Sequence, residues 1–592
     1  MREEESKTPG RADARGFFGR RRAELLCALL LTISALTMLD VVRRKSLTTD
    51  ELVMIPAGYF HVTTGDFRPV GEHPPFIKTL SALPLLFTGT EAPPIDPAPQ
   101  PDYGYFLGLF NEFWQMNHGR YEAVTFWSRV PPVAITVLLG ALVFLYGRRH
   151  FGERAALFAV ALFSLEPTVL AHGRVVQTDV PSALAFFLFV FLLYDYLRKP
   201  ALGRAVAVGL VAGLATVTKF SMVVLGPVIA VAFVALLALA PRLRVKRAQV
   251  AGQAAALAIA AVFAVNAAYF FQRGRPEPFE ASVARSILPE TLTGGPLRGA
   301  LEVGYDALQV VFPADYVYGI GWQIGHARLG HAAGLLGQYS YHGWWYYYPV
   351  AFALKTPLPI ILLSLAGLGW ALWRLARAAD RRMLLLVLPV AFFVALLAAN
   401  SINIGVRYFL PAYPFLFVAA GAFLDWLLRR AGARRSMAAA AAVVALFAWV
   451  GIEAARAHPD HMSYVNQLAS GRPHYWYLSD SNVEWGDDVK PLALYLRERG
   501  ETRVGGAMLS AQVLERYGIE QTEIFVPPGV EPRPVRYVAI GASLLNGSTV
   551  PGAFADGTGL TEKQRVNYFA DFRRRTPEKV FGGSIYLFRL RE

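Results

Sequence analysis

The stretch AELLCALLLTISALTMLDVV at residues 23–42 decides the class of fold. A helix that spans a bilayer needs about 20 mostly apolar residues, and this run meets that length. Comparable runs recur along the rest of the chain. They lie at residues 130–147, 154–171, 180–197, 203–218, 220–240, 248–271, 350–373, 383–400, 406–428 and 436–455. The sequence therefore predicts a polytopic α-helical membrane protein with about eleven transmembrane helices.

Composition narrows the class of protein further. Of the 592 residues, 54% are hydrophobic and 17% are charged, which is typical of a membrane protein that also carries soluble mass. The net charge of +14 does not indicate nucleic-acid binding, because arginine and lysine gather in short loops between apolar runs. The single cysteine, Cys27, lies inside the first run, so an intramolecular disulfide or a cysteine-based zinc site is excluded.

The basic loops predict the orientation of the chain, since arginine and lysine near span ends favour the cytoplasmic side. Every second loop is basic, and these loops are 148–154, 198–204, 242–247, 374–382 and 429–435. Only Arg43–Lys45 disagrees with the alternation. The pattern predicts a cytoplasmic N-terminus. It puts residues 43–129, 172–179, 272–349 and 456–592 on the other side of the membrane.

Three domains are expected. Residues 1–22 are charged and contain glycine, which predicts a disordered cytoplasmic segment. Residues 23–455 form the transmembrane domain, and its first run is a retained anchor because no small-residue cleavage site accompanies it. Residues 456–592 alternate turn signals such as Asn546-Gly547 with apolar runs such as 537–540 and 584–588, which predicts a small mixed α/β domain.

The first loop outside the membrane brings ionisable residues to the lipid boundary. Asp50 and Glu51 follow the first span, and Glu72, His73 and Lys78 surround a Pro-Pro pair that restricts the chain direction. An acid, an imidazole and an ammonium group together suit general-base catalysis on a hydroxyl beside an anionic leaving group. The structural alternative is a helix capping box, because Glu51 follows a threonine by three positions.

Charged residues also lie at the outer ends of later spans. An ionised side chain costs about 2.5–3.5 kcal/mol at the centre of a spanning helix, so such groups belong either to water or to a site. The residues concerned are Arg129, Glu166, His172, Arg174, Asp179, Lys219 and Arg407. If the cations converge, they would neutralise a phosphate at the boundary. The alternatives are interfacial anchoring for the cations and helix capping for Asp179.

Two other segments stand out. Residues 480–488 carry acidic and amide side chains at alternate positions, as a calcium loop does, but they lack the glycine and glutamate that an EF-hand requires. A divalent cation is therefore a secondary expectation beside a turn that leads into an amphipathic helix at 489–499. Residues 339–348 form an aromatic block, for which we expect an interfacial belt, with a platform for a sugar ring or isoprenoid as the alternative.

Taken in chain order, the charged positions resemble a known family. The motifs are Asp50-Glu51, His73-Pro74-Pro75-x-x-Lys78, Arg129, Arg174 with Asp179, and Lys219. They are similar to those of the protein O-mannosyltransferases, over about residues 20–430. The aminoarabinose transferases that modify lipid A are relatives within the same GT-C class of membrane glycosyltransferases. The resemblance implies a GT-C fold and a transferase that takes a sugar from a polyprenyl-phosphate donor.

The resemblance also implies roles for particular residues. Asp50 would be the general base that deprotonates the acceptor hydroxyl, with inversion at the sugar carbon, and Glu51 would help to place a substrate. The residues expected to hold the donor phosphate are Arg129, Arg174, Lys219 and Arg407. Those expected to position substrates are Glu72, His73, Lys78, His172 and Asp179. No metal ligand is expected among them.

The loop at 272–349 is too short for the β-trefoil insert of the fungal mannosyltransferases, so a protein, lipid A and a surface glycan all remain open as acceptors. We expect a hexosyl- or pentosyltransferase in a bacterial inner membrane, with a periplasmic catalytic face. The alternative class is a multi-span transporter or flippase of lipid-linked sugars, although transporters usually hold their charges near the bilayer midplane between two related halves. A pseudoenzyme that scaffolds an assembly is a third alternative.

Overall fold

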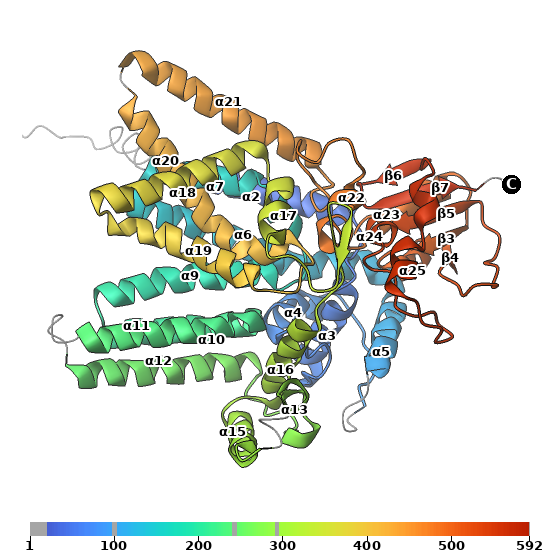
Figure 1. The fold of residues 1–592 in the computed structure, drawn as a ribbon, viewed down its shortest axis with the longest axis horizontal. Coiled ribbons are helices and arrows are strands. Elements are labelled where there is room, and N and C mark those ends of the chain that lie inside the picture. Colours follow the sequence, from blue (N-terminus) through green and yellow to red (C-terminus); the bar gives the residue numbers. More distant parts are fainter. Residues whose placement is uncertain (1–20, 97–102, 240–245, 290–294, 432, 591–592) are drawn as a thin grey trace, which may run out of the picture.

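The computed structural model describes residues 21–96, 103–239, 246–289, 295–431 and 433–590. Within these ranges, nine helices are long and apolar enough to cross a membrane, some of them lengthened by an adjoining 3-10 turn. The corresponding elements are α2 (Arg22–Arg44), α6 (Tyr121–Phe151), α9 (Asp179–Arg198), α11 (Leu225–Leu239), α12 (Arg247–Ala268), α18 (Leu358–Ala378), α19 (Leu384–Ala398), α20 (Tyr413–Arg430) and α21 (Ala433–Ala457) (Figure 1). The predicted segment 1–22 lies almost entirely outside the described residues.

Two of the expected spans fall below the length of a membrane-spanning helix. Helix α10 (Leu202–Thr218) has 17 residues, and the run at 154–171 is divided into α7 (Glu153–Leu165) and α8 (Pro167–His172). Pro167 has no N–H with which to continue α7, and the Glu166 carboxylate accepts the N–H of Val169 at 2.7 Å, so a new helix begins there. A single span at 154–171 is therefore wrong, whereas the polytopic helical fold class is confirmed.

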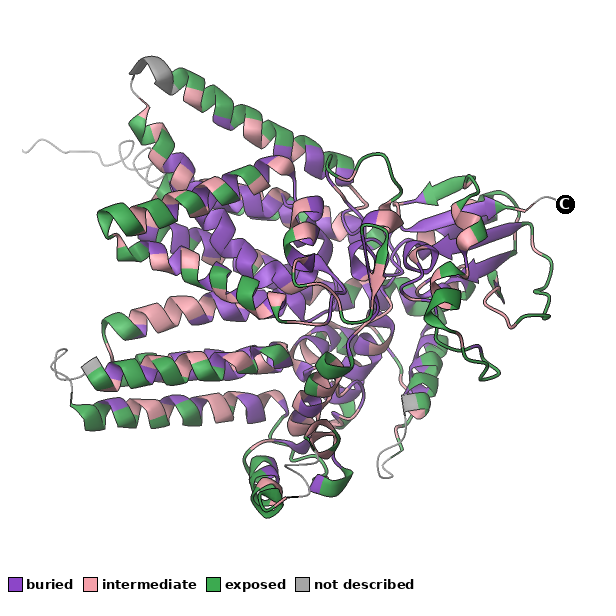
Figure 2. Ribbon diagram, in the orientation of Figure 1, coloured by how far each residue is buried: buried purple, intermediate pink, exposed green. Residues whose placement is uncertain are grey.

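The helices pack around α20, and the peripheral helices leave apolar surface uncovered (Figure 2). In the candidate span that contains α20, 83% of residues are buried, compared with 22% in the span of α21. Helix α10 approaches α12 closely at Gly209, where a Cβ atom would lie 2.2 Å from the carbonyl oxygen of Leu257. The apolar surfaces of α11, α12 and α21 are those expected of helices that face lipid.

Short helices cover one end of this bundle, on the side of the C-terminal domain (Figure 1). The loop at 43–129 contains α3 (Glu51–Thr64), α4 (Pro75–Ala82), η1 (Leu83–Phe87), α5 (Tyr103–Met116) and η2 (His118–Arg120). The loop at 272–349 contains η4 (Phe279–Ala281), α13 (Val283–Ile287), α15 (Arg298–Val311), α16 (Ala314–Leu329) and the hairpin β1 (Ala333–Leu335) and β2 (Gln338–Ser340), before α17 (Tyr347–Lys355). The short turns η3 (Phe220–Val224) and η6 (Val406–Ala412) lie within the predicted spans 220–240 and 406–428.

The C-terminal region forms the predicted mixed α/β domain. Its sheet has the strand order β4-β3-β5-β7-β6, parallel among β4, β3 and β5 and antiparallel from β5 to β6. The strands are β3 (Arg503–Ala507), β4 (Glu520–Glu523), β5 (Tyr537–Gly541), β6 (Lys579–Phe581) and β7 (Ile585–Arg589). The helices are α22 (His474–Tyr477), α23 (Val489–Glu498), α24 (Ala542–Asn546), α25 (Glu562–Asn567) and α26 (Ala570–Arg573), with 3-10 turns η7 (Asp480–Asn482) and η8 (Ala511–Tyr517). The apolar runs at 537–540 and 584–588 become β5 and β7.

Two of the basic loops lie at the end of the bundle away from this sheet. The connections from α9 to α10 and from α18 to α19 both lie at that end (Figure 1). The sheet and the loops at 43–129 and 272–349 lie at the opposite end (Figure 1). All the segments predicted to lie outside the cytoplasm are therefore on one side of the bundle.

Candidate active site

Asp50 lies at the N-terminal end of α3, next to a small polar pocket. Its side chain is 28% exposed, and its Oδ2 atom accepts a hydrogen bond from Nε2 of Gln177 at 2.5 Å. Nη1 of Arg407 lies 3.6 Å from the same oxygen. Burial raises the pKa of Asp50, while the positive charge of Arg407 and the nearby Trp485 side chain oppose that shift. The carboxylate is thus a stronger base than a fully solvated aspartate.

The pocket has a volume of about 30 Å³ and is walled by segments far apart in the sequence. Its lining side chains include Glu72, His73, Gln177, Asp179, Lys219, Gln323, Arg407 and Tyr408. The predicted residues Glu72, His73, Asp179, Lys219 and Arg407 therefore converge, with Asp50 beside them. Burial lowers the pKa of His73 to about 4, so its imidazole is neutral at pH 7. It can donate or accept a hydrogen bond but adds no positive charge for a phosphate.

Lys219 and Arg407 are the cations of this pocket. Lys219 follows the last turn of α10, and its Nζ atom donates to Oδ1 of Asp179 at 2.6 Å and lies 3.9 Å from the centre of the Tyr408 ring. Nη1 of Arg407 lies 3.6 Å from Oδ2 of Asp179. Asp179 is the first residue of α9 and makes no capping hydrogen bond, so its carboxylate serves the two cations and the capping alternative fails.

An apolar groove begins where the polar pocket ends. Its volume is about 410 Å³, and it shares Lys219, Phe220, Gln323 and Tyr408 with the polar pocket. The rest of its wall is mostly apolar and comes largely from α16, α19 and the turn η3. Among these apolar residues are Met222, Ile324, Phe393, Leu397 and Pro411. A molecule with a hydrocarbon chain and an anionic head would fit this succession of surfaces, with its head beside Lys219.

Glu51 and Arg129 lie outside the pocket and pair with each other. Both side chains are fully buried, and Arg129 donates to both carboxylate oxygens, from Nε at 2.8 Å and from Nη2 at 2.5 Å. The backbone N–H groups of Thr48 and Val176 add hydrogen bonds of 2.9 Å each. The expected roles of Glu51 in substrate placement and of Arg129 in phosphate binding are therefore not supported, because each group is already bound by the other.

The capping-box alternative is confirmed for one of its two hydrogen bonds, the one from the backbone N–H of Thr48 to the Glu51 carboxylate. The Glu51 carboxylate accepts both the N–H and the hydroxyl of Thr48. The helix nevertheless begins at Glu51, after Asp50, and not after Thr48. The pair with Arg129 joins the start of α3 to α6, so it holds the backbone that carries Asp50.

Lys78, His172 and Arg174 are also absent from the pocket wall. Lys78 is buried and donates from Nζ to the carbonyl oxygens of Val70 at 2.7 Å and Pro69 at 3.4 Å, so it braces the loop that carries Glu72 and His73. The ring of His172 packs 5.8 Å from that of Trp485. These three side chains contact other protein groups and do not line the pocket. Their predicted contacts with substrate or phosphate are therefore not supported.

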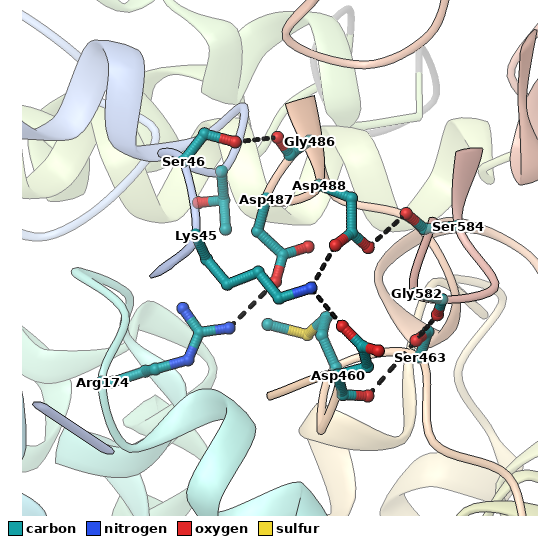
Figure 3. A network of polar contacts seen from close by, with 12 residues as sticks. Lys45, Ser46, Arg174, Asp460, Ser463, Gly486, Asp487, Asp488, Gly582 and Ser584 are labelled. Atoms are coloured by element: carbon teal, nitrogen blue, oxygen red, sulfur yellow. Dashed lines mark hydrogen bonds and ion pairs between the residues drawn. The ribbon is translucent and has the colours of Figure 1, made fainter. Parts of the chain in front are cut away.

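Arg174 binds a residue of the C-terminal domain. Its Nη2 atom donates to Oδ2 of Asp487 at 2.9 Å, and both side chains are buried. Beside them, the ammonium group of Lys45 contacts the carboxylates of Asp488 and Asp460 (Figure 3). The acidic residues 487 and 488 thus have cationic protein partners, and the helix expected at 489–499 is α23. Among the described residues, no three His, Cys, Asp or Glu side chains gather in a way that could hold a metal ion.

The sequence analysis missed several residues of the site. Gln177, Gln323 and Tyr408 line the pocket, and Trp485 lies under Arg407 with 4.0 Å between the guanidinium carbon and the ring centre. Gln177 lies among the charged residues of the segment 172–179 between two predicted spans. This position could have identified it as a residue of the site. Trp485 stood in the conspicuous segment 480–488, but nothing local connects it with Arg407. The aromatic block is divided, since Tyr347 and Tyr348 are buried whereas Trp345 is exposed.

Comparison with known proteins supports the resemblance over part of the chain. Residues 122–268, about a quarter of the chain, match the model of the family described as dolichyl-phosphate-mannose-protein mannosyltransferase. The resemblance expected from the sequence is confirmed for this segment, which contains Arg129, Arg174, Asp179 and Lys219. Among curated proteins, none matches the chain.

Comparison with solved structures gives partial matches to an oligosaccharyltransferase and to ArnT. The oligosaccharyltransferase of Archaeoglobus fulgidus has a TM-score of 0.47 and 12% identity, with 80% of this chain and 58% of that chain covered. ArnT from Cupriavidus metallidurans, bound to undecaprenyl phosphate, has a TM-score of 0.44 and 12% identity, with 95% and 97% covered. The chain thus spans a little more than half of the oligosaccharyltransferase. Likeness at this level carries no argument about substrate.

Proposed function

We propose that this protein transfers a sugar from a polyprenyl-phosphate donor to an acceptor outside the cytoplasm. The observation that carries the proposal is the position of Lys219, which lies on the wall of both the apolar groove and the polar pocket. An isoprenoid chain in the groove would bring its phosphate to Lys219, and the sugar would then extend towards Asp50. The partial match to a family of polyprenyl-phosphate-dependent mannosyltransferases supports the same donor class.

The chemistry follows from the charges of the pocket. Asp50 accepts the proton of the acceptor hydroxyl as the oxygen attacks the anomeric carbon, and the bond from that carbon to the phosphate oxygen breaks. A positioned general base contributes about 10² to 10⁴ in rate. Lys219 and Arg407 stabilise the charge that develops on the leaving phosphate. Attack from the side opposite the phosphate inverts the anomeric configuration.

Asp179 keeps Lys219 and Arg407 close together in the pocket. In the structure Asp179 contacts both Lys219 and Arg407, so their charges stay close together before a donor arrives. The donor phosphodiester carries one negative charge and the released polyprenyl phosphate carries up to two, so both cations gain a partner as the bond to the sugar breaks, and guanidinium groups match phosphate oxygens well. Of the four phosphate ligands expected from the sequence, we assign the role to Lys219 and Arg407 only.

The proposed setting is a bacterial inner membrane with the active site on the periplasmic face. The alternation of basic loops supports this orientation, because the connections from α9 to α10 and from α18 to α19 lie at the end of the bundle opposite the C-terminal domain (Figure 1). The concentration of charge at one end also favours a transferase over the transporter or flippase alternative. The acceptor, whether a protein, lipid A or a surface glycan, would be identified by mass spectrometry of these fractions from a deletion strain.

The test is the variant Asp50→Asn, with Asp556→Asn in the C-terminal domain as the control. We expect D50N to lose transfer by at least about 10²-fold while it still binds polyprenyl phosphate, because only the base is removed. The assay is release of polyprenyl phosphate from a sugar-loaded donor by purified protein in detergent. Turnover by D50N at the rate of wild type would refute the proposal. Movement of the donor across vesicles without formation of a glycosidic bond would establish the flippase alternative.

A further inference from the structure

The segment 478–488 of the C-terminal domain lies inside the protein and not on its surface. Asn482, Glu484, Trp485, Asp487 and Asp488 are all buried. Glu484 ties the segment to its own domain, because its carboxylate accepts the backbone N–H groups of Leu509 and Ser543, each at 2.8 Å. From this anchor the segment reaches into the transmembrane domain.

The segment binds the backbone just before Asp50. The N–H of Ser46 donates to the carbonyl oxygen of Asp487 and the N–H of Thr49 to that of Trp485, each at 2.9 Å. The Ser46 hydroxyl donates to the carbonyl oxygen of Gly486, also at 2.9 Å (Figure 3). Residues 46–49 are therefore held along the segment much as a strand is held by its neighbour.

Buried ion pairs reinforce this contact. Lys45 contacts Asp488 and Asp460, and Arg174 contacts Asp487 (Figure 3). Removing one member of a buried pair leaves an uncompensated charge, so the two domains are strongly coupled here. The C-terminal domain could not move away without exposing or breaking these pairs.

Trp485 connects the segment to the pocket itself. It is 2% exposed, and the guanidinium carbon of Arg407 lies 4.0 Å from the centre of its ring. Its side chain also lies near the Asp50 carboxylate, where it lowers the pKa of that group. One tryptophan therefore lies near both the group assigned to the proton and a group assigned to the phosphate.

We propose that Trp485 is a positioning residue for sugar transfer, and that the C-terminal domain supplies a wall of the active site. This inference rests on the proposed function. Arg407 lies 3.6 Å from each of Asp50 and Asp179, which is too long for a strong hydrogen bond, so carboxylates alone do not define its orientation. The indole ring fixes the guanidinium plane, and the Trp485 side chain favours the ionised form of Asp50.

The effect on Asp50 can be measured through the pH dependence of transfer. The groups that face Asp50 are Arg407 from η6, Asp179 from α9, Gln177 from the turn before α9, and Trp485 with Asp480 from the C-terminal segment. Besides Arg407 and Gln177, Trp485 also favours the ionised carboxylate. Its removal would raise the pKa of Asp50, so the acidic limb of kcat/KM would move to higher pH.

The first experiment compares Trp485→Phe with Trp476→Phe. Both tryptophans belong to the C-terminal domain, and each has an arginine over its ring, Arg407 for Trp485 and Arg472 for Trp476. Phenylalanine keeps an aromatic face but has no N–H. We expect W485F to fold, to bind polyprenyl phosphate, and to shift the acidic limb to higher pH, since the indole no longer favours the ionised carboxylate of Asp50. W476F should keep the wild-type profile.

The second experiment uses cross-linking to test whether the C-terminal domain stays in place as a wall of the active site during transfer. The hydroxyl oxygens of Thr49 and Ser510 lie 2.9 Å apart across the domain contact. In a Cys27→Ala background, Thr49→Cys with Ser510→Cys should form a disulfide on oxidation, and the oxidised protein should retain transfer. Reversible loss of transfer on oxidation would show that the domain must move, which overturns the inference.

Different results would refute the proposed function and the positioning role of Trp485. A wild-type protein that transfers no sugar refutes the proposed function and the inference with it. An active wild type whose pH profile is unchanged in W485F refutes the role of Trp485 alone. A shift of equal size in W476F would assign the effect to general loosening of the domain and would also overturn the role of Trp485.

Discussion

Replacement of Glu51 by glutamine should destabilise the protein strongly, because it leaves Arg129 buried without a counterion. Both side chains are fully buried, and Arg129 donates to both carboxylate oxygens. Breaking a buried pair by neutralising one partner costs about 3–5 kcal/mol, whereas replacing both partners can be nearly neutral. The size of the effect therefore reports whether Glu51 is a structural counterion.

The hydrogen bonds around Glu51 predict a similar loss of stability for E51Q. Oε1 accepts from Arg129 Nε and from the Val176 N–H, whereas Oε2 accepts from Arg129 Nη2 and from the N–H and hydroxyl of Thr48. A glutamine has one NH₂ group in place of one oxygen, and in either orientation that group would face at least two donors. Each unsatisfied buried donor costs about 1–3 kcal/mol, so the sum agrees with the cost of breaking the pair.

The assay is thermal unfolding of the purified protein in one detergent. We expect E51Q to unfold at a clearly lower temperature, and the double variant E51Q with Arg129→Met to recover part of the loss. The control is Glu91→Gln, because the pair of Glu91 with Arg120 is exposed and such pairs contribute about 0–1 kcal/mol. If E51Q and E91Q unfolded at the same temperature, the structural role would be refuted. A stable E51Q without transfer would instead assign Glu51 the catalytic role implied by the family resemblance.

Two further predictions concern the phosphate site. Lys219→Met should weaken binding of polyprenyl phosphate by about 10–100-fold, because a charge-assisted contact of about 1.5–3 kcal/mol is lost. Lys199→Met, at the exposed C-terminal end of α9, is the control, and equal affinities in a binding titration would contradict the assignment. Transfer should persist in EDTA, because Lys219 and Arg407 supply positive charge beside the leaving phosphate. Loss of activity that Mg²⁺ or Mn²⁺ restores would instead reveal a metal requirement.

Much of the fold could be predicted because its signals are local. Apolar runs of about 20 residues mark spanning helices whatever their neighbours are, and turn residues between short apolar runs mark the strands of the C-terminal domain. The break at Glu166-Pro167 was also visible in the sequence, since proline cannot continue a helix. It was read as a feature of a turn and not as the end of a span.

The candidate site was only partly predictable from residue types. Asp50, Asp179, Lys219 and Arg407 do come together, while Arg129, Arg174 and Lys78 are bound by other protein groups. A cation at the end of a span has the same sequence signature whether it anchors, pairs or binds a ligand. Which of these it does depends on the atoms within about 4 Å, and a distant residue can supply them, as Asp487 does for Arg174 across 313 positions.

The amino-acid sequence by itself determined that this is a multi-span helical membrane protein with a mixed α/β domain at its C-terminus, and that charge collects near one membrane surface. Only the tertiary structure decided which charges remain available. It paired Glu51 with Arg129, bound Arg174 to Asp487, and brought Trp485 beneath Arg407. The physical reason is that hydrophobic length acts along the chain, whereas a buried charge must find its partner in three dimensions.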